Sequence, residues 1–72
     1  MKALAARQII KILEANGFVV ARQRGSHVIY RNRSSGRIVP VPLHGGNKTL
    51  PIGTFLAIVK QSGIDAKEFE KK

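Results

Sequence analysis

Cysteine and tryptophan are absent from this chain of 72 residues, and carboxylate side chains are scarce. Without cysteine the protein has no disulfide and no thiolate metal ligand, which is typical of proteins from a reducing cytoplasm. No apolar run reaches the roughly 20 residues that a membrane-spanning helix needs, and the N-terminal residues carry no long hydrophobic signal region. We therefore expect a cytoplasmic protein that does not associate with membranes.

Acidic side chains are missing from the middle of the chain. The four acids are Glu14, Asp65, Glu68 and Glu70, so residues 15–64 contain none, while the net charge of the whole chain is +9. A small domain ordinarily mixes both signs on its surface, and a long stretch of one sign is typical of proteins that bind a polyanion such as nucleic acid. The alternative to polyanion binding is a basic surface that is exposed to solvent and only keeps the protein soluble.

The chain has few side chains that could bind a metal ion. Metal-dependent nucleases gather carboxylates around Mg²⁺, and the middle of this chain offers none. Its two histidines, without further ligands, do not make a zinc site. We therefore predict no metal and no cofactor.

Hydrophobic periodicity predicts a helix followed by three strands. Residues 4–16 carry apolar side chains at helical spacing, and Asn16-Gly17 supplies the left-handed residue that ends a helix. Three runs of strand-forming residues follow, separated by turns at Gly25-Ser26 and at residues 33–36. The predicted strands are residues 18–23, 27–32 and 37–41.

A second helix is predicted near the C-terminus. Residues 54–62 carry an apolar stripe at helical spacing, Pro51 is suited to open the helix, and Gly63 is suited to end it. Asp65 then occupies a capping position before a short turn that carries Phe69. The length allows one small domain, residues 1–72, with its core at about residues 4–64 and a C-terminal turn and tail at residues 65–72.

The two prolines of the third strand restrict the order of the sheet. Pro40 and Pro42 are two positions apart, so their missing amide hydrogens face the same edge, which a central strand does not tolerate. The third strand is therefore expected at the edge of a three-stranded antiparallel meander. Two helices stacked on one face of this sheet bury both apolar stripes, which predicts an α+β fold in the order α-β-β-β-α. The pattern does not decide which face of the middle strand is buried: one carries His27, Ile29 and Arg31, and the other Val28, Tyr30 and Asn32.

Several short motifs follow one another along the chain. They are Asn16-Gly17-Phe18, Arg22-Gln23-Arg24-Gly25-Ser26-His27, Val39-Pro40-Val41-Pro42-Leu43-His44-Gly45, Lys48, Leu50-Pro51 and Gly53-Thr54. From about residue 4 to residue 64 the chain thereby resembles the HicA toxins of bacterial and archaeal toxin-antitoxin pairs. The resemblance implies a fold like that of double-stranded-RNA-binding domains, an mRNA-cleaving ribonuclease (an mRNA interferase), and inhibition by a HicB-type antitoxin. It also implies that His27 is catalytic, because His27 occupies the position of the histidine in the family's Gly-Ser-His motif. The extra glycine in Gly45-Gly46 departs from the family pattern and leaves the conformation of that loop open.

The chemistry of RNA agrees with a site built on one histidine. RNA carries its own nucleophile, the 2′-hydroxyl, and an imidazole can take its proton near neutral pH, a contribution of roughly a hundred- to ten-thousand-fold. Neighbouring arginines can stabilise the charge that develops on the phosphate. We therefore expect His27 to act as general acid/base in a metal-independent endoribonuclease whose products are a 2′,3′-cyclic phosphate and a 5′-hydroxyl.

Other residues are candidates for contacts with RNA. His44 and Ser26 are candidates for a catalytic or phosphate contact, although a loop histidine beside two glycines is more often a turn residue. Tyr30 would stack on a base if it faced outward, whereas a tyrosine in a strand more often packs in the core. The candidate RNA-binding residues are Arg22, Arg24, Gly25, Arg31 and Lys48.

Two other classes of function remain open at this point. A non-catalytic RNA-binding module of the same fold would bind duplex RNA by its shape, but such modules generally carry a lysine cluster at the start of the last helix, where this chain reads Pro51-Ile52-Gly53-Thr54. A small basic subunit of a larger complex is the third class. On the favoured interpretation the partners are mRNA and an acidic antitoxin that covers the basic surface.

Overall fold

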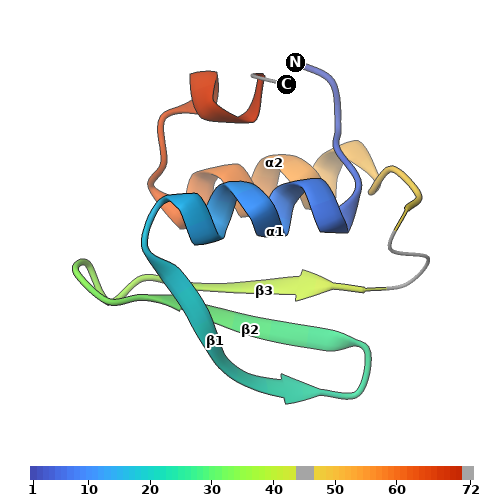
Figure 1. The fold of residues 1–72 in the computed structure, drawn as a ribbon. Helices are drawn as coiled ribbons and strands as arrows, with labels where there is room; N and C mark the ends of the chain where they lie inside the picture. Colours follow the sequence, from blue (N-terminus) through green and yellow to red (C-terminus); the bar gives the residue numbers. More distant parts are fainter. Residues whose placement is uncertain (44–46, 71–72) are drawn as a thin grey trace.

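The structure is a computed structural model that describes residues 1–43 and 47–70, and its elements follow the predicted order (Figure 1). The elements are α1 (Ala6–Ala15), β1 (Phe18–Arg24), β2 (His27–Asn32), β3 (Ile38–Pro42), α2 (Ile52–Ser62) and the short 3-10 helix η1 (Ala66–Phe69). The predicted α+β class, with its three-stranded antiparallel sheet and two helices, is confirmed. Within the described ranges, no helix combines the length and the apolar character that crossing a membrane requires.

The sheet is a meander in the order β1-β2-β3, so β3 lies at an edge as its prolines predicted. The N–H of Leu43 donates to the carbonyl of Ser26 at 2.6 Å, and the N–H of Asn32 donates to the carbonyl of Arg37 at 2.9 Å. The odd-numbered residues of this segment therefore direct their backbone polar groups at β2. Because that direction alternates along a strand, Pro40 and Pro42 turn theirs toward the free edge, where a missing N–H leaves no ladder bond unmade.

Both helices cover the same face of the sheet, and the opposite face is uncovered (Figure 1). Val28 and Tyr30 of β2 are buried against the helices, so His27, Ile29 and Arg31 lie on the uncovered face, which we call the open face. This choice follows from desolvation, since the alternative would bury a guanidinium and an imidazole without partners. The core consists of Ala6, Ile9, Leu13, Phe18, Val28, Tyr30, Val39, Val41, Leu50, Phe55, Ile58 and Phe69.

The first helix begins later than predicted because the chain before it is extended. Leu4 accepts a hydrogen bond at its carbonyl from the N–H of Leu50 at 3.0 Å, and Ala5 forms an isolated β-bridge with Thr49. These contacts fix the backbone in a conformation that is not helical, so α1 begins at Ala6. β2 has the predicted bounds, and β1 begins and α2 ends at the predicted residue. The remaining boundaries differ from the predicted ones by one or two residues, among them the start of α2, which lies at Ile52 directly after Pro51.

The C-terminal turn closes one side of the core. Gly63 ends α2 in the left-handed conformation, with φ of +69°, as predicted. Asp65 caps η1, because its carboxylate accepts a hydrogen bond from the N–H of Lys67 at 3.0 Å. Phe69 is thereby placed edge-on against Phe55, with ring centroids 5.9 Å apart and an interplanar angle of 83°. Full burial of an aromatic or aliphatic side chain of this size stabilises the fold by about 1.5–3 kcal/mol.

Candidate functional site

A tight hairpin turn determines where His27 lies. Arg24 of β1 pairs directly with His27 of β2, and only Gly25 and Ser26 connect them. Gly25 has φ of +58° and Ser26 does not have positive φ, which fits a type II′ turn with glycine at its first central position. The first residue of β2 is therefore held opposite Arg24, and their side chains share one face of the sheet.

A β-bulge at Ala21 brings two arginines to the face that carries His27. Val20 pairs with Tyr30 and Arg22 pairs with Ile29, so Ala21 has no partner in the register. Strict alternation would place Arg22 and Arg24 on the same face as the buried Phe18. The extra residue shifts the alternation, so that one strand buries Phe18 under the helices and still presents both arginines on the open face.

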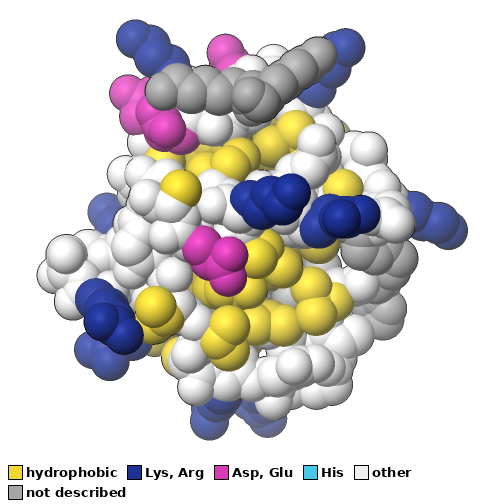
Figure 2. Space-filling view, in the orientation of Figure 1, with side chains coloured by type: hydrophobic (Ala, Val, Ile, Leu, Met, Phe, Trp, Pro, Cys, Tyr) yellow, Lys and Arg dark blue, Asp and Glu magenta, His cyan; other side chains and the backbone are white. Residues whose placement is uncertain are grey.

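The open face is basic, and the acids lie on the side that the helices cover. Arg22, Arg24 and Arg31 share the open face with His27. Figure 2 shows lysine and arginine side chains at every level of the molecule, including below the sheet, whereas the acidic side chains in view lie beside and above the helices. This separation follows from the elements that carry the acids: Glu14 belongs to α1, and Asp65, Glu68 and Glu70 belong to η1 and its two flanking positions. An anion approaching the open face therefore meets positive charge only.

A groove leads from His27 over the free edge of β3 to α2. It has a volume of about 790 Å³, and His27 and Lys48 both line it. His27 lies directly opposite Pro42 in the register, and the two residues form one of the non-hydrogen-bonded pairs, in which side chains approach most closely. The remaining lining residues are Pro40, Pro42, Thr49, Leu50, Pro51, Gly53, Thr54, Ala57, Ile58 and Gln61.

The structure brings most of the predicted site residues together. Arg22, Arg24, Gly25 and Arg31 lie on the open face or in the turn beside His27, and Lys48 joins His27 in the groove. Ser26 is half-buried in the turn, and its carbonyl anchors β3 through Leu43. The predicted roles of these residues remain predictions. His44 and Gly45-Gly46 lie outside the described residues.

Tyr30 is a core residue, so its side chain is not available for stacking on a base. Its side chain is 4% exposed and packs on the face covered by the helices. Burial raises the pKa of the Tyr30 hydroxyl above its ordinary value of 10.0, and the negative charge of Glu14 raises it further. Of the two roles considered for Tyr30, stacking on a base and packing in the core, the structure shows packing in the core.

Several groove residues were not recognised in the sequence. Pro40 and Pro42 signalled the sheet edge, but that edge was not connected to a ligand-sized groove. Thr54, Ala57 and Gln61 follow at helical spacing along the exposed side of α2. In the sequence, this spacing did not indicate a binding groove, because the sequence does not show that β3 lies beside α2.

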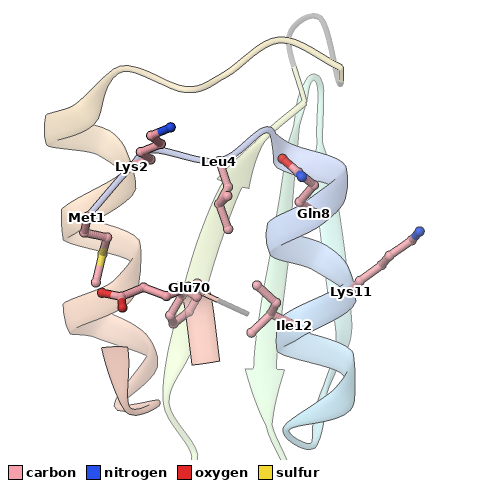
Figure 3. Close-up of a pocket in the computed structure, with 8 residues that line it drawn as sticks. Met1, Lys2, Leu4, Gln8, Lys11, Ile12 and Glu70 are labelled. Carbon is pink, nitrogen blue, oxygen red and sulfur yellow. The ribbon is translucent and has the colours of Figure 1, made fainter. Parts of the chain in front are cut away.

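A second hollow of about 820 Å³ lies elsewhere, between the N-terminal segment, α1 and the chain after η1. Leu4 and Ile12 point into the space between the helices, and Lys11 points away from it (Figure 3). Of the predicted site residues that the structure describes, none lines this hollow. Over the part of the chain that the structure describes, there is no cluster of three or more His, Cys, Asp or Glu side chains placed to hold a metal ion.

The fold and the site define a small α-β-β-β-α protein with a histidine on a basic, uncovered sheet face. Residues 6–64 match the family model described as the HicA toxin of bacterial toxin-antitoxin systems. The chain belongs to this family, whose members are generally toxins of the RNase type, and it is the toxin of a toxin-antitoxin pair. As such it has an antitoxin as its partner. No curated protein sequence matches the chain.

Proposed function

We propose that this toxin is a metal-independent endoribonuclease that cleaves mRNA, with His27 as general acid/base. One observation carries the proposal: His27 lies on the same open face as Arg22, Arg24 and Arg31. A phosphate of the RNA backbone that reaches His27 on this face lies beside Arg24, which pairs directly with His27. Guanidinium groups stabilise the charge that phosphoryl transfer creates.

The reaction needs a base, an acid and stabilisation of the charge on the phosphate, and it needs no metal ion. His27 removes the proton of a 2′-hydroxyl, and the 2′-oxygen forms a bond with the adjacent phosphorus. The bond between phosphorus and the 5′-oxygen breaks, and the leaving oxygen takes up a proton. The products are a 2′,3′-cyclic phosphate and a 5′-hydroxyl. Ser26 and His44 remain candidates for a contact with the phosphate or for donation of the second proton.

The experiment that tests this function is RNA cleavage in EDTA by wild-type protein and by His27→Ala. We expect wild type to cleave and His27→Ala to lose about a hundred- to ten-thousand-fold in rate while still binding RNA. Both proteins should unfold at similar temperatures, since His27 is exposed. Equal cleavage by the two proteins, or cleavage by wild type only after Mg²⁺ is added, would sink the proposal. Binding without cleavage by both would instead support a non-catalytic RNA-binding module.

We further propose that the partner is an acidic antitoxin of the HicB type that covers the open face and keeps RNA away from His27. The net charge of +9 and the acid-free open face support this. Association with an acidic protein should be fast and should slow as salt increases. Co-expression with the product of the adjacent open reading frame is the test, and we expect that product to bind the toxin and relieve growth inhibition in the cytoplasm. A product that does neither would remove the support for this partner.

A further inference from the structure

The free edge of β3, which borders the groove beside His27, presents backbone hydrogen-bond acceptors and few backbone donors. Pro40 and Pro42 line the groove and direct their backbone groups away from β2. Neither proline has an N–H, so each contributes only a carbonyl oxygen there. An ordinary edge strand would present alternating donors and acceptors at the same place.

The walls of the groove fit a flat, largely apolar group. The rings of Pro40 and Pro42 form one side, and Ala57 and Thr54 of α2 face them across the groove. β3 and α2 lie next to each other at this edge of the molecule (Figure 1). A volume of about 790 Å³ falls in the range of pockets that hold small organic ligands. Gln61 and Thr54 add polar side chains along the helix side.

Charge and position connect this groove to the cleavage site. His27 and the exposed Lys48 both line the groove, whose other lining residues are mostly apolar or uncharged, so the groove offers two basic side chains to backbone phosphates. A single strand of RNA alternates phosphates with flat bases. The groove is thus continuous with the surface on which the scissile phosphate is proposed to lie.

We propose that the groove binds the base of a nucleotide next to the phosphate at His27, and that it favours bases with an exocyclic amino group. The carbonyl of Pro40 or that of Pro42 accepts a hydrogen bond from that amino group, while the proline rings and Ala57 contact the face of the base. Adenine, cytosine and guanine carry such a group, and uracil does not. On this proposal, β3 and α2 determine which RNA sequences the protein prefers. The proposal rests on the proposed function only in taking the neighbouring phosphate as the one that is cleaved.

The test measures binding of RNA that cannot be cleaved. Two hexamers are compared, one of 2′-O-methyladenosine and one of 2′-O-methylpurine riboside, which differ only in the exocyclic amino group. We expect wild type to bind the adenosine hexamer about three- to tenfold more tightly, the size of one net hydrogen bond. Ala57→Trp fills the groove from an exposed position of α2 and should bind both hexamers equally. Leu56→Trp, on the same helix but outside the groove, is the matched control and should keep the preference.

The outcomes separate this proposal from the nuclease itself. The base site is overturned if wild type binds the two hexamers equally or if Ala57→Trp keeps the full preference. The groove would then be a binding surface for a protein partner. A clear preference in wild type that disappears in Ala57→Trp supports the base site even if unmodified RNA is not cleaved in EDTA. In that case the nuclease proposal fails and the binding proposal stands.

Discussion

At the scale of single residues, Ala21 determines which side chains accompany His27. Because this one residue has no partner in β2, Arg22 and Arg24 lie on the open face, whereas Phe18 of the same strand lies in the core. The sequence did not predict this arrangement, since an alternating strand can be shifted by one residue anywhere along its length. The charge of the two arginines made them candidates for contacts with RNA, but the sequence did not show on which face of the sheet they lie.

Tyr30 provides a residue-scale prediction that can be measured without any partner. It is the only tyrosine, and the chain has no tryptophan, so ultraviolet absorbance during alkaline titration reports on this side chain alone. Its pKa is raised by burial and, to a smaller degree, by Glu14. We expect the titration midpoint of the folded protein to lie above 10.0, the ordinary value. The variant Glu14→Gln should lower that midpoint only in part, because burial is the larger cause.

The same shift makes stability depend on pH in a defined direction. Below pH 10 the hydroxyl is neutral in both folded and unfolded chains, so Tyr30 contributes no pH dependence there. As pH rises past 10 the unfolded chain loses the proton first, and the free energy of unfolding falls until the folded protein ionises as well. Denaturant unfolding between pH 9 and 11 should show a smaller loss for Tyr30→Phe than for wild type. Equal losses in the two proteins would contradict the raised pKa.

At the scale of elements, two turns that each contain a glycine with positive φ serve different purposes. Gly25 joins β1 to β2 with φ of +58°, and Gly36 precedes β3 with φ of +75°. A Cβ atom at either position would meet no other atom within 4 Å. A substitution by alanine therefore costs only the backbone strain of positive φ, about 1–3 kcal/mol.

This pair of turns gives a matched test of how the hairpin positions His27. We expect Gly25→Ala and Gly36→Ala each to lower the free energy of unfolding by about 1–3 kcal/mol. Only Gly25→Ala should also reduce cleavage, by about tenfold or more, because it displaces the start of β2 and with it the imidazole. The measurement compares cleavage rates at a temperature where both variants are fully folded. A similar loss of cleavage in the two variants would show that the turn at Gly25 has no special role in placing His27.

The elements were largely predictable because turns and periodicity are local properties. Pro40 and Pro42 correctly placed β3 at an edge, and Gly63 correctly ended α2. The start of α1 was wrong because the contacts of Leu4 and Ala5 with Leu50 and Thr49 join segments far apart in the sequence. The groove between β3 and α2 escaped prediction for the same reason, since its lining residues meet only in the folded chain. Tertiary contacts of this kind override local preference.

At the scale of the whole molecule, the acids lie only on the helix side, where basic side chains lie as well, whereas the described side chains of the open face include arginines and no acid. On the proposed function, RNA binding should weaken as salt increases, because each phosphate contact releases counterions. We expect the double variant Arg22→Gln and Arg24→Gln to reduce the slope of log affinity against log salt by about 0.7 for each lost contact with single-stranded RNA. The control, Lys11→Gln with Lys60→Gln, removes the same charge from exposed positions on the two helices. An equal reduction of the slope in both double variants would mean that net charge, not the open face, drives binding.

The two edges of the sheet have a consequence for the toxin when its antitoxin is gone. Exposed strand edges invite chains to pair with one another and aggregate. In this protein, one edge carries Pro40 and Pro42, and the other is interrupted at Ala21 and lined by arginines. Two copies therefore cannot readily join their sheets into a continuous ribbon, and like charges on the open face repel a second copy. We therefore expect a toxin released from its partner to stay dispersed, with the open face accessible; on the proposed function, that face is then free to bind RNA.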